Sequence, residues 1–217
     1  MKIGITGISG VIGSVLYQGL KNKYEIIGFD LNNSDNNIDL MNPEGIFNEI
    51  DIVIHLAGNK NNTDVFENLL EPNIIMCQRV FEECKKAKVK KVIFASSNHV
   101  QIKGFNFEGF GNPVNRLEKY ILSNKDEYYP DSFYGVTKIF GEMLGKYYSE
   151  VENAFNFIGI RIGWVINPED APDTDYFNCM WLKNEDCIKV FRDAIENQNK
   201  FDILYGVSSD DIYKKES

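Results

Sequence analysis

Short apolar runs alternate with amphipathic helical segments along most of this chain, and this alternation constrains the fold more than any other feature. The runs expected to form strands are residues 2–6, 25–29, 51–56, 91–95, 155–162 and 201–205. Helical spacing marks residues 11–22, 64–87, 133–150 and 184–198. Strands that are apolar on both faces need cover on both faces, so we expect an α/β fold: a doubly wound parallel sheet with helices on both sides.

The composition indicates which kinds of binding partner this chain disfavours. The chain has 217 residues, enough for one domain with a real core, and its 43% hydrophobic and 25% charged residues are ordinary for a globular protein. Acidic side chains number 32 against 23 basic ones, a net charge of −9 that repels phosphate backbones and anionic lipid, so we expect neither nucleic-acid nor membrane binding. The first ten residues enter a strand pattern without a signal-peptide core, and we therefore expect a cytoplasmic protein.

The cysteines and histidines fit the same compartment. The four cysteines include no C-x-x-C pair, and Cys77 and Cys84 share a helix face about 10 Å apart, too far for a disulfide. We expect reduced, buried thiols. Neither of the two histidines has a Cys or His at metal-ligand spacing, so no metal site is predicted.

A glycine-rich turn joins the first expected strand to the first expected helix. Gly7, Gly10 and Gly13 form G-x-x-G-x-x-G, and Val11 and Ile12 open the helix. Such glycines let backbone approach a pyrophosphate, and the helix N-terminus supplies N–H groups and a positive dipole end. The alternative is a helix that happens to contain three glycines. The strand before the motif and the helix after it favour a Rossmann-type dinucleotide site.

Asp30 ends the second expected strand, where an acid binds the ribose hydroxyls of a dinucleotide. A carboxylate there repels a 2′-phosphate, so NAD is favoured over NADP as the predicted cofactor. The other interpretation of Asp30 is a solvated turn residue. No G-x-x-x-x-G-K-[ST] motif occurs, so an ATP-binding P-loop is not supported.

Tyr134 and Lys138 form Y-x-x-x-K, a spacing that places both side chains on one helix face. A nearby ammonium stabilises the phenolate of a tyrosine, whose reference pKa is about 10, so the phenol can exchange a proton near neutral pH. The motif alone is weak evidence, because Tyr17 and Lys21 repeat it.

The glycine spacing resembles the extended short-chain dehydrogenase/reductase family, which includes nucleotide-sugar epimerases and dehydratases. Asp39 and Leu40 resemble its short acidic motif near adenine, and the run from His55 through Leu56, Ala57 and Gly58 resembles a strand motif that lines the cofactor. His55 itself is interpreted as a packed strand-end residue. The resemblance implies NAD as cofactor and a catalytic set of Ser97, Tyr134 and Lys138.

The run S-S-N-H-V at 96–100, with N-I-I at 73–75 and Y-G-V-T-K at 134–138, is similar to the uronate dehydrogenase branch. Those enzymes oxidise the anomeric carbon of a hexuronic acid to a lactone with NAD. The similarity implies that Ser97, Asn98 and His99 bind substrate hydroxyls and that Asn73 supports the lysine and its water. The alternative for the two serines is that they satisfy backbone groups at a strand end.

Two positions depart from this branch. Tyr176 stands where an arginine is expected to bind the substrate carboxylate, and Lys60 lies in a loop where a substrate-binding serine is expected. Losing a bidentate carboxylate partner costs a site built around it about 2 kcal/mol or more. Lys60 either supplies the missing charge or is a solvated loop residue.

The sequence thus predicts an enzyme of sugar metabolism, an NAD-dependent oxidoreductase that acts on a CH–OH group of a sugar or sugar acid. A nucleotide-sugar epimerase or dehydratase is the second hypothesis, disfavoured because it needs a larger C-terminal region, and a non-catalytic dinucleotide-binding module is the third. Residues 1–217 are expected to form a single domain in which about 164–200 supply a minimal C-terminal substrate segment. The resemblance also implies a homodimer formed through helices 64–87 and 133–150.

Overall fold

The computed structural model describes residues 1–31, 38–101, 128–166 and 180–208. Within these ranges the chain forms a six-stranded sheet in the order β2-β1-β3-β4-β5-β6. Every pairing in the sheet is parallel. The strands are β1 (Lys2–Thr6), β2 (Glu25–Phe29), β3 (Ile52–His55), β4 (Lys91–Ser97), β5 (Asn156–Ile162) and β6 (Phe201–Gly206). The predicted doubly wound parallel sheet is confirmed, and the six predicted strand positions with it.

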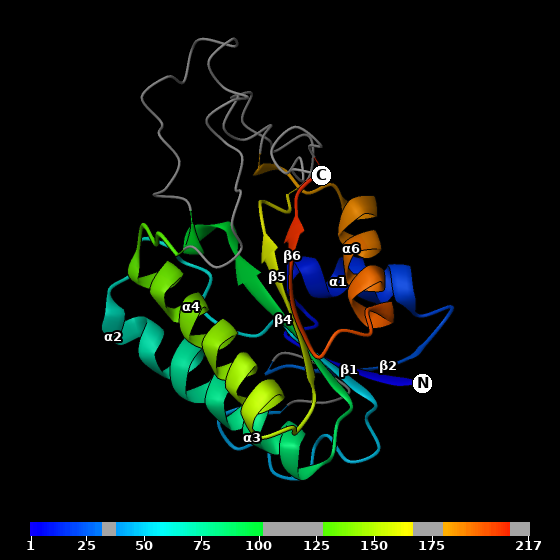
Figure 1. The fold of residues 1–217 in the computed structure, drawn as a ribbon. Helices are drawn as coiled ribbons and strands as arrows, with labels where there is room; N and C mark the ends of the chain where they lie inside the picture. The colour runs from blue at the N-terminus through cyan, green and yellow to red at the C-terminus, as the bar shows by residue number, and fades with distance from the viewer. Residues whose placement is uncertain (32–37, 102–127, 167–179, 209–217) are drawn as a thin grey trace.

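Helices cover both faces of the sheet (Figure 1). On one side lie α1 (Val11–Leu20) and α6 (Asn184–Glu196), and on the other lie α2 (Phe66–Leu69), α3 (Met76–Lys86) and α4 (Phe133–Lys146). The alternating side chains of the central strands separate two cores. Ile93 of β4 packs in the core under α1 and α6, whereas its neighbours Val92 and Phe94 pack in the core under α3 and α4. This two-sided burial explains why the strands are apolar throughout.

The predicted helix at 64–87 is divided into three segments. Between α2 and α3 the chain forms the π-helical segment η1 (Leu70–Ile75). Pro72 lies inside it, and proline removes a backbone N–H donor and clashes with the preceding turn, so a regular α-helix cannot run through this point. The predicted helix at 133–150 likewise ends in a π-helical turn, η5 (Tyr147–Val151), after α4.

The remaining predictions concern shorter elements and the surface. A 3₁₀ turn, η2 (Asn98–Val100), follows β4 directly, whereas most of the loop predicted at 101–130 lies outside the described residues.

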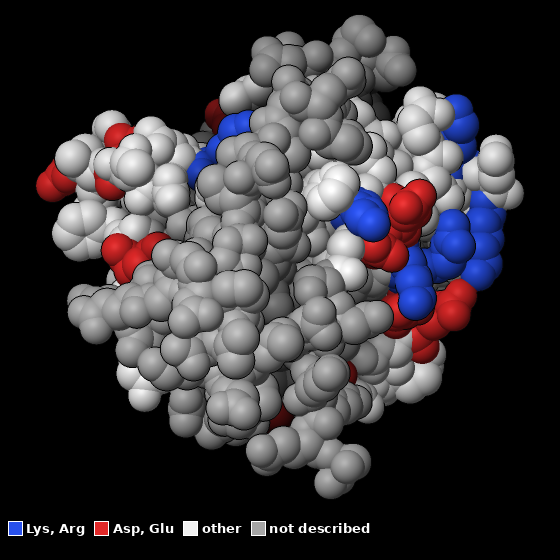
Figure 2. All heavy atoms as spheres, turned by 90° about the horizontal axis from the view of Figure 1, so that it is seen from above, with Lys and Arg blue, Asp and Glu red and all other residues white. Residues whose placement is uncertain are grey.

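Cys77, Cys84 and Cys187 are free and buried, as expected, and burial raises the pKa of the Cys77 thiol to about 12. Among the described residues, no helix is long and apolar enough to cross a membrane. Seen from above, acidic and basic side chains lie next to one another on the right of the view, whereas mainly acidic ones are visible on the left (Figure 2).

Candidate active site

A cavity of about 840 Å³ lies at the carboxyl ends of the central strands. This edge is where open parallel sheets bind ligands, because the strand order reverses there and the loops diverge. The cavity brings together almost all of the predicted site residues. Those lining it are Gly7, Gly10, Val11, Ile12, Gly13, Asp30, Asp39, Leu40, Leu56, Ala57, Gly58, Lys60, Ser97, Asn98, His99, Tyr134 and Lys138. Asn73 lies behind the wall, and Tyr176 falls outside the described residues.

The glycine turn forms one side of this cavity. Gly7 has φ of +73°, a backbone conformation that a larger residue would adopt only with strain. A Cβ on Gly7 would also lie 2.8 Å from the backbone nitrogen of Ala57 and would collide with the segment that follows β3. A Cβ on Gly13 would lie 2.6 Å from the carbonyl oxygen of Gly7. Gly10 is the N-cap of α1, and no side chain in the described part of the chain caps this helix end. The turn therefore offers uncapped N–H groups and a positive helix end, which suits a pyrophosphate.

The acidic residues of the predicted cofactor site lie at the same end of the cavity. The Asp30 carboxylate accepts a hydrogen bond from the backbone N–H of Ser9 at 3.0 Å, which ties the end of β2 to the glycine turn. Asp39 accepts one from the backbone N–H of Met41 at 2.8 Å. Asp30 is thus next to the turn, in a position to accept hydrogen bonds from the ribose hydroxyls of a dinucleotide bound there.

His55 is a packed residue, in agreement with its interpretation from the sequence. It is 1% exposed, and its Nδ1 lies 2.7 Å from the Thr6 hydroxyl. Burial, with a smaller contribution from the positive charge of Lys138, lowers the pKa of His55 to about 3. The neutral imidazole therefore serves the packing between β1 and β3 and does not exchange protons at neutral pH.

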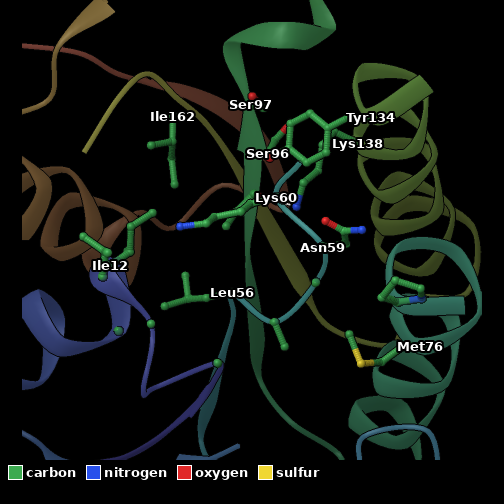
Figure 3. Close-up of a pocket in the computed structure, with 18 of the residues that line it drawn as sticks. Ile12, Leu56, Asn59, Lys60, Met76, Ser96, Ser97, Tyr134, Lys138 and Ile162 are labelled. Atoms are coloured by element: carbon green, nitrogen blue, oxygen red, sulfur yellow. Dashed lines mark hydrogen bonds between the residues drawn. The ribbon is translucent and has the colours of Figure 1, made fainter. Parts of the chain in front are cut away.

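Tyr134 and Lys138 extend from the first turns of α4 toward the end of β4 (Figure 3). The Lys138 side chain is 7% exposed, and its Nζ donates to the carbonyl oxygen of Ala95 at 2.8 Å. The same Nζ lies 5.5 Å from the centroid of the Tyr134 ring. The tyrosine and the lysine of the Y-x-x-x-K motif therefore lie side by side at the end of β4.

Ser97 and Asn98 close the end of β4. The Ser97 hydroxyl donates to Asn98 Oδ1 at 3.2 Å and accepts from the backbone N–H of His99 at 3.3 Å. Asn98 Nδ2 is buried and makes no hydrogen bond within the described part of the chain. Buried donors are nearly always paired, so an unpaired amide in the wall of a cavity indicates a polar ligand. This observation supports the prediction that Asn98 binds a substrate oxygen.

Asn73 does not line the cavity but holds the loop that does. Its side chain accepts from the backbone N–H of Asn59 at 2.7 Å and donates to the Asn59 carbonyl oxygen at 3.0 Å. Its Nδ2 also lies 3.1 Å from the Thr137 hydroxyl, next to Lys138 in α4. Asn73 therefore connects the loop after β3 to the helix that carries Tyr134 and Lys138. Lys60 is exposed, lines the cavity, and extends over it in Figure 3.

A buried charged cluster behind β4 was not predicted. Arg161 of β5 forms a two-pronged ion pair with Glu142 of α4, with Nη2 2.8 Å and Nε 3.0 Å from the carboxylate oxygens, and both side chains are 0% exposed. Ser96 donates to the same carboxylate at 2.5 Å, so its hydroxyl faces α4. The available signal was the position of Glu142, one helical turn after Lys138. No group of acidic, histidine or cysteine side chains suited to a metal occurs among the described residues.

A parallel sheet with a glycine turn between its first strand and helix defines a dinucleotide-binding Rossmann domain. The model of the NAD dependent epimerase/dehydratase family matches residues 3–183, and the chain belongs to this family. Family membership confirms the fold and the NAD cofactor expected from the sequence.

The relatives include sugar dehydrogenases. L-arabinose 1-dehydrogenase (NAD(P)(+)) of Haloferax volcanii is 28% identical over 90% of this chain and 82% of its own length. Uronate dehydrogenase of Pseudomonas putida is 27% identical over 95% of this chain and 76% of its own. The fold matches a mutant uronate dehydrogenase from Agrobacterium tumefaciens complexed with NAD, with a TM-score of 0.79, 22% identity, and coverage of 98% of this chain and 78% of that one.

Proposed function

We propose that this protein is an NAD-dependent dehydrogenase that oxidises the anomeric hydroxyl of an aldose or a hexuronic acid to the lactone. One observation carries the proposal: a single cavity is lined by the glycine turn and by Ser97, Tyr134 and Lys138. The dinucleotide site and the proton-transfer group are therefore in reach of one substrate. Bound NAD would supply the hydride acceptor.

The chain's own residues would perform the remaining steps. Gly7, Gly10 and Gly13 would hold the pyrophosphate at the N-terminus of α1, and Asp30 would bind the adenosine ribose. Ser97 and Tyr134 would hydrogen-bond the reacting hydroxyl, and the Tyr134 phenolate would take its proton as the carbon is oxidised. The positive charge of Lys138, beside the Tyr134 ring, would stabilise negative charge on the tyrosine oxygen during the proton transfer.

The substrate is proposed as a small sugar or sugar acid because two of the relatives are named for their action on L-arabinose and on uronates. Asn98 would bind a further hydroxyl, and Lys60 would attract a carboxylate. His99, whose two ring nitrogens are engaged by neighbouring side chains, would form part of the wall around the substrate. We place Tyr176 in the substrate region as well. Trp164 and the two residues after it line the cavity, which supports a small substrate segment within about 164–200 of one domain.

A substrate panel tests the proposal. The purified protein is incubated with NAD or NADP and with L-arabinose, other aldoses, hexuronates and sugar phosphates, while NADH formation is followed by absorbance. We expect turnover with at least one aldose or hexuronate, and a preference for NAD over NADP because Asp30 repels a 2′-phosphate. Absence of reduced cofactor with every sugar would refute the dehydrogenase proposal.

The epimerase alternative has specific support, because the family includes epimerases and the fold also matches a UDP-glucuronic acid 4-epimerase from Bacillus cereus at a TM-score of 0.74. An epimerase regenerates its cofactor in each cycle. Tightly retained NAD, with a UDP-sugar converted and no NADH released, would favour it. NAD binding without any conversion would favour the non-catalytic module.

We further propose a cytoplasmic homodimer. The helical layer of α2, η1 and α4 exposes large apolar side chains: Val65 (55%), Phe66 (36%), Leu70 (37%), Phe133 (57%), Val136 (44%) and Met143 (39%). The Phe66 and Phe133 rings are in contact, with centroids 5.8 Å apart, so apolar surface continues from one helix to the next. A contiguous apolar patch of this kind on a globular protein marks an interaction site.

The three described cysteines, free and buried, agree with a reducing compartment.

Charges introduced into this helical layer should separate the subunits. Val136 and Met143 lie seven residues apart on α4, on one face. We expect the V136E/M143E double variant to be a monomer in sedimentation velocity under conditions where the unsubstituted protein is a dimer, because burying two carboxylates is unfavourable. Tyr17→Glu, at a 41% exposed site on α1 across the sheet, is the control and should remain dimeric. A dimeric double variant would place the interface elsewhere.

A further inference from the structure

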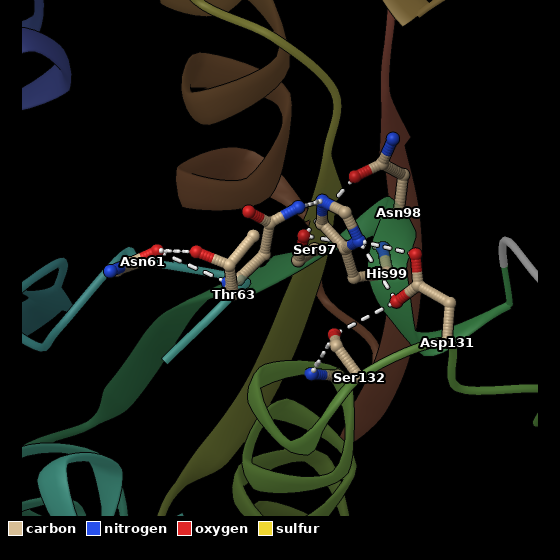
Figure 4. Close-up of polar contacts among 9 residues, drawn as sticks. Asn61, Thr63, Ser97, Asn98, His99, Asp131 and Ser132 are labelled. Atoms are coloured by element: carbon tan, nitrogen blue, oxygen red, sulfur yellow. Dashed lines mark hydrogen bonds and ion pairs between the residues drawn. The ribbon is translucent and has the colours of Figure 1, made fainter. Parts of the chain in front are cut away.

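His99 has both ring nitrogens engaged, although it lies in the wall of the cavity. It belongs to η2, directly after β4, and is 8% exposed. Its Nδ1 lies 3.0 Å and 2.9 Å from the two oxygens of the Asp131 carboxylate, and its Nε2 lies 3.2 Å from the side-chain amide nitrogen of Asn62 (Figure 4). Asp131 and Asn62 were not singled out from the sequence.

These partners determine where the His99 proton resides. An ionised carboxylate only accepts hydrogen bonds, so Nδ1 carries the proton. Nε2 is then free to accept from the Asn62 amide, and both contacts are satisfied by a neutral imidazole. We assign the Nδ1–H tautomer with Nε2 as acceptor from these two neighbours, with the amide nitrogen of Asn62 facing the ring.

Asp131 is itself held in place by the start of α4. The hydroxyl of Ser132 donates to Asp131 Oδ1 at 2.8 Å, and Ser132 is the N-cap of the helix, where it accepts from the backbone N–H of Gly135 at 3.2 Å. A carboxylate is also favoured near a helix N-terminus by the helix dipole. The carboxylate therefore has a defined position relative to α4, which carries Tyr134 three residues after Asp131.

The imidazole in turn packs against Tyr134. The ring centroids of His99 and Tyr134 are 5.6 Å apart with an interplanar angle of 79°, an edge-to-face contact. Rotation of the imidazole would lose the Asp131 and Asn62 hydrogen bonds at once. One side of the Tyr134 ring therefore packs against His99, and the Asp131 carboxylate fixes the orientation of His99.

We propose that Asp131 is a positioning residue that fixes the tautomer and orientation of His99, and through its ring the orientation of the Tyr134 phenol at the reacting hydroxyl. The proposal rests on the proposed function for its effect on turnover. The geometric part, from Asp131 through His99 to Tyr134, is measurable without any substrate.

The first test is nitrogen-15 NMR of the unsubstituted protein. The chain has only two histidines, so the spectrum is simple, and His55→Gln assigns the second one. We expect His99 to be protonated at Nδ1 and unprotonated at Nε2, with nuclear Overhauser contacts between its ring protons and those of Tyr134. A proton found on Nε2, or no contact with Tyr134, would overturn the proposal even if the protein is an active dehydrogenase.

The second test is the Asp131→Asn variant, whose amide can donate to Nδ1 and so favours the opposite tautomer. We expect the proton to move to Nε2 and kcat to fall about 10- to 100-fold, the range seen when a group that orients a functional histidine is lost, with the KM for NAD unchanged. Asp51→Asn, at the opposite end of the sheet where Asp51 pairs with Lys90, is the matched control and should leave both readouts unchanged.

Wild-type kcat in Asp131→Asn, despite a reversed tautomer, would contradict the positioning role. If the unsubstituted protein oxidises no sugar, the proposed function fails, while the tautomer and the Tyr134 contact still decide the geometric part. If Asp131→Asn does not fold, the spectrum of the unsubstituted protein gives the same decision.

Discussion

Replacing Tyr134 with phenylalanine is expected to lower kcat for sugar oxidation by about 10²- to 10⁴-fold, the usual contribution of a positioned proton-transfer group. The variant keeps the ring, and with it the edge-to-face contact to His99, while it removes the hydroxyl. NAD binding, measured by calorimetry, should change little because the glycine turn and Asp30 are untouched. The measurement is initial-rate kinetics with the substrate identified in the panel.

The chain offers a matched control for this experiment. Tyr17 and Lys21 have the same spacing, and the Lys21 Nζ lies 5.3 Å from the Tyr17 ring centroid, close to the 5.5 Å of the Tyr134 pair. Tyr17 is 41% exposed on α1 and does not line the cavity. Tyr17→Phe should therefore retain full activity. Equal activity of Tyr134→Phe and the unsubstituted enzyme would exclude Tyr134 as the proton acceptor.

Removing the Glu142 carboxylate should have the largest effect on stability. Glu142→Ala leaves the Arg161 guanidinium without its two-pronged partner at a site with 0% exposure, and removes the acceptor of the Ser96 hydroxyl. Breaking one partner of a buried ion pair costs about 3–5 kcal/mol, because an uncompensated charge remains in the core. We expect a loss of this size in the free energy of unfolding, measured by urea denaturation at pH 7 without NAD.

Two comparisons show whether the cost comes from the buried charge. The Glu142→Leu and Arg161→Met double replacement should recover much of the stability, because no unpaired charge is left. Glu196→Ala breaks the Lys23–Glu196 pair, whose side chains are 57% and 59% exposed, and should change the stability little, because water screens an exposed ion pair. A loss from Glu142→Ala as small as that from Glu196→Ala would show that the buried pair contributes little.

The parts of the site that come directly after a strand in the chain could be predicted from the sequence. The end of β1, the glycine turn and the start of α1 are consecutive in the chain, so a local pattern contains all of their geometry. The same holds for Ser97 at the end of β4 and for the tyrosine and lysine one turn apart on α4. The break in the predicted helix at 64–87 also has a local cause, Pro72, but a proline can kink a helix as well as end it.

The parts that depend on distant segments were not predictable. Glu142 and Arg161 come from α4 and β5, and Asn62 and Asp131 lie on opposite sides of His99 in the chain, 37 and 32 residues away. An aspartate before a helix and an asparagine in a loop are common surface residues. Nothing in their neighbours along the chain distinguishes these two from solvated ones.

The sequence by itself determined the fold class and the cofactor and predicted the proton-transfer pair, because periodic burial and short motifs are properties of neighbouring residues. The tertiary structure alone decided how those motifs are supported: Asn73 behind the loop after β3, the Glu142–Arg161 pair behind β4, and Asp131 on His99. These supports are hydrogen bonds and ion pairs between segments far apart in the chain, and their partners become neighbours only when the parallel sheet brings the ends of its strands to one edge.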